Sequence, residues 1–472
     1  MAGIRSSGAR APSELPRGPH SLSREEVAGN QRQRLMAALI DAIGEQGYAK
    51  TTVAHVIARA GVSRKAFYEH FPNKQACLLE TYDVLARDVV EHVTEAYLRE
   101  SETAASARAG VSALFEWASE RPHALRLVLL EVSSTGPAGI ERREQLLGSF
   151  EDLLTAGLQL PPGPNPVLRA IIGGFNRVLY TRARSGHYSQ LSGLVPALVE
   201  WATSYYPVPR SMMRLQQRAR TPPRTPAMLA GGRAPGTLFP HIATAERRGL
   251  VGARASVSRS LVVHSQRERI LDAVANLTSE RGYAGLICER IAEAAAVSLN
   301  AFYTHFTGKE DAFLVAYEVG HHKSLAAVQH ASAAQRDWQH SVRAGIGALF
   351  DFLAAEPAFA HMALVDALTA TQRTAERSAK GAVEYARMLA PDPRERALQA
   401  RQPRVIGEAI SGGLFELCFS QTLRGRVRVL PELLPAATYF VLAPVVGAKQ
   451  AAKVATRSAD AALTSEADIG AG

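Results

Sequence analysis

The sequence predicts an all-α protein in which one chain carries two similar helical units. The stretch "VSRKAFYEHFPNK" at 62–74 recurs with few changes as "VSLNAFYTHFTGK" at 297–309. Apolar residues follow helical spacing, as in the run from Val53 to Ala60, and no convincing strand alternation accompanies them. A chain of 472 residues is also too long for one ordinary core. A duplicated helical unit is therefore the simplest architecture.

The duplication follows a constant offset of 235 residues through most of the first unit. "GVSALFEWASERP" from Gly110 aligns with "GIGALFDFLAAEP" from Gly345, including the proline that ends each segment. After a four-residue slip, Gly173-Gly174 meets Gly412-Gly413. The two units, each of about 185 residues, are 22–206 and 257–446.

The first unit begins with a helix-start signal. "LSREEV" from Leu22 places Glu26 three residues after Ser23, which is the spacing of a capping box. We therefore expect a short helix that leads into the first long helix. The copy keeps only "VSR" from Val257.

The next two elements form a predicted helix-turn-helix. Thr52 precedes an apolar helix at 53–59, Gly61 ends it, and Ser63 begins a second short helix. Thr52 and Ser63 are suitable N-caps because a side-chain oxygen can accept a hydrogen bond from a free amide of the first turn.

The rest of the unit also has helical spacing. Apolar residues predict helices around 146–154 and 167–179, and breaks are expected at Pro122, at the "PPGPNP" run from Pro161 and at Gly186. We count about nine helices in each unit. The fold class is therefore all-α, twice over.

The second helix of the helix-turn-helix has two chemically different faces. Phe67 and Phe71 are four residues apart and should face the core, which leaves Arg64, Lys65 and Tyr68 on the outer side. A short, positively charged face with an aromatic hydroxyl suits a helix that enters the major groove while its flanks hold phosphates.

The segment "TTVAHVIARAGVSRKAFYEHFPNKQACLLETYD" resembles the DNA-binding domain of the tetracycline-repressor (TetR) family of transcriptional regulators. The resemblance covers about fifty residues and includes the aromatic pair, histidine and lysine of the signature: Phe67, Tyr68, His70 and Lys74. It implies that the first three helices bind DNA, that a fourth joins them to a helical ligand-binding domain, and that the last two helices pair with a second unit.

This resemblance divides the chain into seven parts. They are a disordered tail at 1–21, a helix-turn-helix domain at 22–83, a ligand-binding and pairing domain at 84–206, a flexible linker at 207–256, a second helix-turn-helix-like domain at 257–318, a second ligand-binding and pairing domain at 319–446, and a disordered tail at 447–472.

The resemblance also implies roles for individual residues. Thr52, Tyr68, His70 and Lys74 would contact phosphates, with Lys74 aided by the N-terminus of the following helix. Ser63, Arg64 and Lys65 would face base edges or nearby phosphates. In the second copy the corresponding candidates are Ser298, Asn300, Tyr303, His305 and Lys309. Plainer readings stay open: His70 can be a buried packing histidine, and an exposed cation can be merely solvated.

The second copy departs from the pattern at the DNA-facing positions. Gly61 becomes Ala296, Thr52 becomes Ile287, and Arg64-Lys65 becomes Leu299-Asn300. The span 31–75 has seven basic and three acidic residues, a net charge of +4, whereas 266–310 has five and six, a net charge of −1. The second head is therefore either a weaker DNA-binding domain, in which Asn300 reads an adenine edge, or a vestige.

Covalent linkage of the two units predicts a pseudo-dimer on DNA. Two unlike heads would bind an imperfect palindrome, and the linker would keep the second head at high effective concentration. The expected pairing residues are Gly173, Gly174, Phe175, Val178, Leu198 and Trp201 in the first unit, with Gly412, Gly413, Phe415, Leu434 and Phe440 in the second. Burial of the same stripes within each unit's own core is the alternative.

The basic charge is concentrated in one segment. Of the net charge of +10, the stretch 207–256 supplies +8, from nine arginines and one glutamate. Seven prolines and the lack of periodicity favour a linker that is either merely solvated or touches DNA.

The remaining features exclude several classes of protein. Cys77, Cys288 and Cys418 are far apart and are interpreted as reduced core residues. The best apolar run, near Ala436–Ala448, is short and holds Pro444, and we expect a cytoplasmic protein without a membrane partner. The sequence has no G-x-S-x-G elbow, H-E-x-x-H motif, P-loop or dinucleotide fingerprint, which argues against an enzyme.

The expected partners follow from the resemblance. They are an operator in double-stranded DNA and an unidentified small-molecule effector, with no cofactor. Phe115, Trp117 and Phe150 are possible lining residues of the effector site, although aromatic stripes of this kind are more often plain core. Repression, activation and further dimerisation of chains are not distinguished. A sensing or protein-binding module with only the first head active on DNA is the alternative function.

Overall fold

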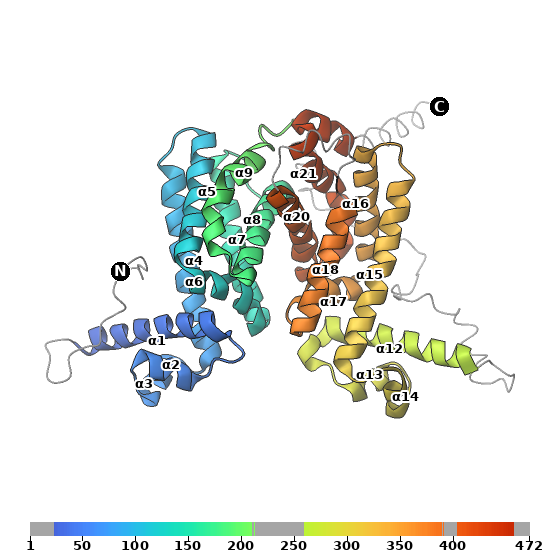
Figure 1. The fold of residues 1–472 in the computed structure, drawn as a ribbon, viewed down its shortest axis with the longest axis horizontal. Helices are drawn as coiled ribbons and strands as arrows, with labels where there is room; N and C mark the ends of the chain where they lie inside the picture. Colours follow the sequence, from blue (N-terminus) through green and yellow to red (C-terminus); the bar gives the residue numbers. More distant parts are fainter. Residues whose placement is uncertain (1–22, 210–211, 213–258, 389, 391–403, 457–472) are drawn as a thin grey trace. The chain divides into compact units, whose positions relative to one another are not determined.

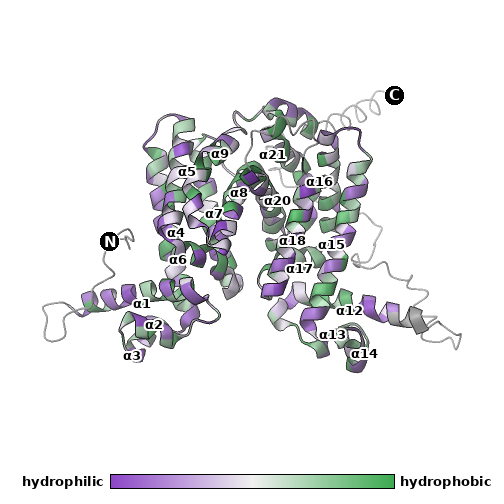
Figure 2. Ribbon diagram, viewed as in Figure 1, coloured by the Kyte–Doolittle hydropathy of each residue, from purple (hydrophilic) through white to green (hydrophobic). Residues whose placement is uncertain are grey.

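The computed structural model describes residues 23–209, 212, 259–388, 390 and 404–456, and all regular secondary structure in these residues is helical (Figure 1). The all-α prediction is confirmed for this part of the chain. The predicted N-terminal tail and all but a few residues of the predicted linker lie outside the described residues. Hydrophilic and hydrophobic residues alternate along most helices, as amphipathic elements around a core require (Figure 2).

The chain forms two compact units whose limits differ from those of the two repeats. The first unit comprises Met1–Ser204 with Gln402–Gly413, and the second comprises Tyr205–Arg401 with Leu414–Gly472. A short piece of the second repeat thus belongs to the first unit. Inside that unit, Arg182 donates to Glu408 at 2.6 Å.

The first head consists of three helices, α1 (Arg24–Gln46), α2 (Val53–Ala60) and α3 (Arg64–His70). The capping box at Ser23 and Glu26 is present. The helix that it begins, however, continues for 23 residues as α1 instead of ending as a separate short helix. No glycine or proline breaks this stretch before Gly29, and Gly29 meets no neighbouring atom, so the helix passes through it.

Helix α4 (Lys74–Leu98) runs out of the head and into the rest of the first unit. The predicted domain boundary at 83–84 therefore lies within one continuous helix. The same holds in the second repeat, where α15 (Lys309–Ala333) spans the predicted boundary at 318–319. In both repeats a rigid rod, and not a flexible joint, connects the head to the helices behind it.

The helices behind the first head pack around α4 and α5. They are α5 (Thr103–Glu120), α6 (Pro122–Arg126), η1 (Leu127–Glu131), η2 (Val132–Thr135), α7 (Pro137–Gly157), α8 (Pro166–Ser185), η3 (Tyr188–Gln190) and α9 (Leu191–Thr203). The predicted stops at Pro122 and Gly186 fall at the start of α6 and at the end of α8.

The second repeat has the same order of elements. They are α12 (Arg259–Arg281), η4 (Tyr283–Gly285), α13 (Cys288–Ala294), α14 (Leu299–His305), α15, α16 (Trp338–Ala355), α17 (Pro357–Leu364), η5 (Asp366–Leu368), α18 (Gln372–Met388), α20 (Arg404–Leu423), η6 (Val427–Leu433) and α21 (Leu434–Val446). Among the described residues, each repeat has nine such α-helices, in agreement with the sequence-based count.

The end of the second repeat differs from the prediction of a disordered tail from residue 447. Residues 448–456 are helical, and Ala451, Ala452, Val454 and Ala455 are buried. Small apolar side chains at helical spacing can pack in this way, a pattern that the sequence reading overlooked. Residues 457–472 lie outside the described part of the chain.

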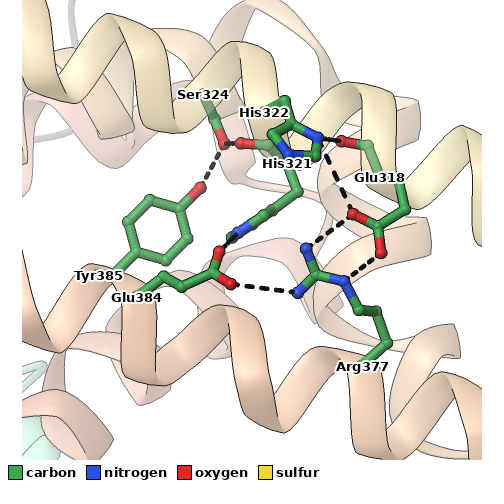
Figure 3. A network of polar contacts seen from close by, with 7 residues as sticks. All are labelled: Glu318, His321, His322, Ser324, Arg377, Glu384 and Tyr385. Atoms are coloured by element: carbon green, nitrogen blue, oxygen red, sulfur yellow. Dashed lines mark hydrogen bonds and ion pairs between the residues drawn. The ribbon is translucent and has the colours of Figure 1, made fainter.

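A polar cluster joins α15 to α18 in the second unit (Figure 3). Arg377 Nη2 donates to Glu318 at 2.7 Å, and His321 Nε2 lies 2.5 Å from a carboxylate oxygen of Glu384. Ser324 and Tyr385 share a further hydrogen bond. Buried polar groups of this kind are stable only when they are paired with each other, as they are here.

The first repeat keeps only one pair of this cluster. Asp83 and Arg142 occupy the positions of Glu318 and Arg377 and are joined at 2.9 Å. The other four positions hold Ala86, Val89, Ser149 and Phe150. The duplicated helices thus share one ion pair, and the second repeat has a partly buried network that the first repeat lacks.

Two further sequence expectations concern apolar residues. Cys77 and Cys418 are buried free thiols, and burial raises the pKa of each to about 12; Cys288, by contrast, is only half-buried and is not a core residue. Val427–Val446 is apolar enough to cross a bilayer by length and composition, but half of its most apolar window is buried within the protein. Core helices of globular proteins have the same character.

Candidate nucleic-acid interface

The outer face of α3 is an exposed cationic surface of the first head. The Lys65 side chain is 88% exposed, and its nearest charged partner is Glu69, at 3.9 Å one helical turn away. The Arg64 guanidinium lies 5.9 Å from the centre of the Tyr68 ring, and Tyr68 is itself 47% exposed. The opposite face is buried through Phe67, so the two-faced helix expected from the sequence is present.

The turn between α2 and α3 is held in place by caps on both sides. The Thr52 and Ser63 hydroxyls accept hydrogen bonds from the amides of His55 and Ala66, at 3.2 and 3.1 Å. Both predicted N-caps are therefore present. Gly61 lies between them in the left-handed conformation, with φ of 62°. A contact of either hydroxyl with DNA stays a prediction.

His70 lies at the edge of the same face. Its Nε2 is 3.4 Å from the side-chain oxygen of Gln31 on α1. Burial, with the charge of Arg32, lowers the pKa of His70 below its usual value. A neutral imidazole can still donate one N–H to a phosphate, but it adds no positive charge.

Lys74 is placed differently from a free phosphate ligand. Its Nζ donates to the carbonyl oxygens of Tyr48 and Thr51, at 2.8 and 2.7 Å, and lies 3.9 Å from the centre of the Tyr48 ring. Burial lowers the pKa of this ammonium. Lys74 therefore ties the start of α4 to the turn that precedes α2, a role that the sequence reading did not identify.

The second head repeats this scaffold. Ser298 caps α14 through the amide of Ala301 at 3.1 Å, and Phe302 is fully buried. Lys309 Nζ donates to the carbonyl oxygens of Tyr283 and Leu286, at 3.4 and 2.9 Å. The local fold of the head is therefore retained despite its altered surface.

The surface of the second head has changed at several positions together. Ile287 precedes α13, which has no side-chain hydrogen bond at its N-cap. Ile287, Leu299 and Tyr303 are 42%, 37% and 52% exposed, and Asn300 is also exposed. His305 resembles His70, since burial lowers its pKa. Apolar side chains thus stand where the first head presents Thr52 and Arg64.

A contact between each head and the helices behind it was missed by sequence reasoning. Glu131 accepts from the backbone amide of Tyr48 at 3.2 Å and is held by Arg126 at 3.1 Å. In the second repeat, Asp366 accepts from the amide of Tyr283 at 3.1 Å and lies 2.9 Å from His361.

These carboxylates occupy equivalent positions, since 366 is 131 plus the repeat offset of 235. We call the two contacts the Glu131 latch and the Asp366 latch. The sequence signal for these contacts was a carboxylate at equivalent positions of both repeats, Glu in the first and Asp in the second. The sequence alone does not show that this carboxylate lies against the head, because it is 83 residues away from Tyr48 in the chain.

The predicted pairing residues are mostly buried. Phe175 packs against Trp201, with ring centres 5.5 Å apart, and Val178 and Leu198 are fully buried. A Cβ on Gly174 would lie 2.4 Å from the Trp201 ring and 2.7 Å from the carbonyl oxygen of Ala409, which belongs to the same unit.

The second-repeat members of the set are divided between the two units. Gly412 and Gly413 belong to the first compact unit. Phe415, Leu434 and Phe440 belong to the second, where Phe440 is fully buried and stacks on Tyr205.

The possible effector-site aromatics are packed against other side chains. Phe115 lies 6.3 Å from the Phe175 ring centre, and Trp117 donates its indole N–H to Asp88 at 2.7 Å. Phe150 is half-buried. Within the described residues, no group of three or more His, Cys, Asp or Glu side chains is arranged to hold a metal ion.

Comparison with known proteins agrees with this geometry. The family of bacterial regulatory proteins called tetR matches twice, at residues 35–81 and 270–316, which are the two heads. The chain therefore carries the helix-turn-helix domain of the TetR family in duplicate.

One curated relative is the HTH-type transcriptional regulator CymR of Pseudomonas putida. It is 37% identical over 73 residues, which are 16% of this chain and 36% of CymR. The chain therefore matches only about a third of the length of that relative.

The similar solved structures have low sequence identity to this chain. The fatty acid degradation regulator FadR of Bacillus halodurans is 16% identical and covers 36% of this chain and 94% of its own, with a TM-score of 0.34. The transcriptional regulator FadR of Bacillus subtilis, solved with stearoyl-CoA, is 18% identical and covers 36% of this chain and 96% of its own, with a TM-score of 0.33.

Proposed function

We propose that this chain is a sequence-specific DNA-binding transcriptional regulator that acts in the cytoplasm as a covalent pseudo-dimer. The observation that carries the proposal is the presence of two capped helix-turn-helix heads in one chain, the first with Arg64, Lys65 and Tyr68 on its outer face. A single head reads few base pairs, so two linked heads gain affinity and specificity together. Because their outer residues differ, the operator would be an imperfect palindrome.

Pairing of the two repeats within one chain is supported by the composition of the compact units. The close approach of Gly174 to the Ala409 carbonyl and the ion pair between Arg182 and Glu408 both lie inside the first unit. Tyr205 donates to the Phe440 carbonyl at 3.0 Å inside the second. Such contacts bring segments from both repeats into each unit.

An effector is part of the proposal because both heads match the TetR family. A small molecule bound among the helices behind a head would shift the population of DNA-competent states. If binding of the small molecule caused the protein to release its operator, the protein would act as a repressor.

A second candidate function is favoured by the surface of the second head. Its net charge of −1 and its exposed Leu299 suit a head that does not bind DNA. The chain would then be a sensing or protein-interaction module with one active head.

The test is a gel shift on an operator selected from random duplexes with the whole chain. Tyr68→Ala and Tyr303→Ala each remove an exposed aromatic side chain, and Leu98→Ala, an exposed leucine on α4, serves as the control. The pseudo-dimer predicts that both tyrosine variants weaken binding and that footprints cover two half-sites. An unchanged affinity of Tyr303→Ala would favour the second candidate. Solution mass with and without operator reports whether chains associate further.

A further inference from the structure

The two heads present different chemistry on nearly the same scaffold. Ser63 and Ser298 cap their helices at the same distance, and Phe67 and Phe302 are both fully buried. The backbone of α14 is therefore presented as α3 is. What differs is the outer side chains, where Arg64 and Lys65 are replaced by Leu299 and Asn300.

The exposed apolar side chains of the second head lie on the two helices of its helix-turn-helix. Leu299 and Tyr303 are one turn apart on α14, and Ile287 directly precedes α13, which packs against α14. Of the six large hydrophobic side chains that are well exposed in the described residues, Ile287, Leu299 and Tyr303 are three. Exposed apolar side chains gathered at one place mark a surface that contacts a partner.

The major groove offers a partner for the side chains that differ between α3 and α14. Arginine and lysine bind the O6 and N7 acceptors of guanine, asparagine pairs with the N6 and N7 of adenine, and apolar groups contact the thymine methyl. Arg64 and Lys65 therefore suit a guanine. Leu299 and Asn300 suit neighbouring A·T pairs.

Electrostatics separates the two heads further. The span 266–310 has a net charge of −1, against +4 for 31–75, and Glu289 lies near Tyr303. Glu289 has a local reason, because α13 lacks a side-chain cap and an acidic residue in the first turn stabilises its N-terminus. The second head consequently gains little from phosphates, and contacts to bases must supply most of its affinity.

We propose that the second head is the discriminating head, which reads an A·T-containing half-site through Leu299 and Asn300. The first head anchors the chain electrostatically on a guanine-containing half-site. This inference rests on the proposed DNA-binding function and names the bases that each head recognises. The operator is then asymmetric in composition as well as in sequence.

The test removes thymine methyl groups without changing base pairing. The whole chain first selects an operator, and each thymine of one half-site is then replaced by deoxyuridine. At the thymine in contact with Leu299, affinity falls about fourfold, the value of one buried methyl or methylene group. The Leu299→Ala variant binds the thymine and deoxyuridine duplexes equally well. Leu98→Ala, the same change at another exposed leucine, keeps the full sensitivity.

A second variant assigns the half-site to its head. Leu299→Arg combined with Asn300→Lys restores the residues of the first head and shifts selection at that half-site from A·T to guanine. Asn300→Ala alone lowers the preference for adenine by about fivefold or more, the lower limit for a bidentate base contact.

The outcomes separate this inference from the proposed function. Binding of no duplex by the whole chain overturns the function itself. Binding that ignores deoxyuridine in both half-sites, together with unchanged selection by the Leu299 and Asn300 variants, overturns the inference and leaves the function standing. The exposed apolar surface would then belong to a protein contact.

Discussion

Ala296 occupies a backbone conformation that the first head gives to a glycine. It has a φ of 51°, a left-handed conformation, at the position where Gly61 has 62°. A residue with a Cβ is strained in this region, whereas glycine adopts it freely. We expect Ala296→Gly to raise the free energy of unfolding of the second unit by up to about 1 kcal/mol.

The reciprocal change is the matched control. Gly61→Ala should destabilise the first unit by about the same amount, since it introduces the same strain. Thermal or urea unfolding followed for each unit checks both variants. Stabilisation by Gly61→Ala, or destabilisation by Ala296→Gly, would contradict the strain argument.

Lys74 separates a structural role from a DNA-binding role. Its ammonium donates to two backbone carbonyls at the turn before α2. We expect Lys74→Met to destabilise the first head by about 1–3 kcal/mol, because two charge-assisted hydrogen bonds are lost while the aliphatic stem is kept. Urea unfolding of the DNA-free protein measures this loss. The exposed Lys65→Met serves as the control and should leave stability unchanged.

At the scale of elements, the Glu131 latch is one of the contacts through which the helices behind the first head hold it. Glu131→Gln removes the charge from the hydrogen bond to the Tyr48 amide and from the pair with Arg126. We expect faster hydrogen exchange of amides in residues 47–52 with little change in α8. Glu131→Asp, the carboxylate used at position 366, should restore much of the protection. Equal exchange in the parent and Glu131→Gln would show that the latch carries no coupling.

The cluster between α15 and α18 predicts a pH dependence of stability. Burial holds the pKa of His321 below its usual value, although its hydrogen bond with Glu384 opposes this. The pKa of Glu384 is lowered by His321, and that of Glu318 by Arg377.

The sign follows from the unfolded chain, in which a histidine has a pKa near 6.5. Below that pH the unfolded chain binds a proton that the folded cluster accepts less readily, so stability is lost on acidification. The lowered carboxylate pKa values act in the same direction at lower pH.

The measurement is the unfolding midpoint between about pH 8 and 5, a window set by the histidine value. His321→Gln keeps a hydrogen-bond donor beside Glu384 without a titrating ring, and its midpoint should fall less on acidification. His322→Gln changes an exposed neighbour and should behave as the parent does. A parent midpoint that is independent of pH over this window would contradict the prediction.

The sequence predicted the heads more fully than the helices behind them. Short-range chemistry determines the caps at Thr52 and Ser63, the stop at Gly61 and the buried face of α3, so local pattern was sufficient there. The Glu131 latch and the hydrogen bonds of Lys74 to two backbone carbonyls depend on contacts between residues far apart in the chain. A single sequence gives no measure of such distances.

The same limit applies at the scale of the whole molecule. The repeat offset located both units, but it could not show that Gln402–Gly413 groups with the first unit, because that depends on packing and not on ancestry. Nor did it separate the stripes used for pairing from those buried in each core: Phe175 and Trp201 pack on each other, while Gly174 also approaches Ala409. Helical stripes look alike in sequence whichever surface they meet.

The salt dependence of DNA affinity tests whether the first head supplies the electrostatic contacts and the second head the apolar contacts. If the pseudo-dimer neutralises about eight phosphates, the slope of log affinity against log salt should be near −7. Lys65→Gln should reduce the magnitude of the slope by about one, because it removes one cation from the face of the first head that lies against the DNA. Leu299→Ala should lower affinity while leaving the slope unchanged, since its contact is apolar. Binding isotherms on one operator across a range of salt concentrations measure both quantities. A slope that changes with Leu299 but not with Lys65 would reverse the roles proposed for the two heads.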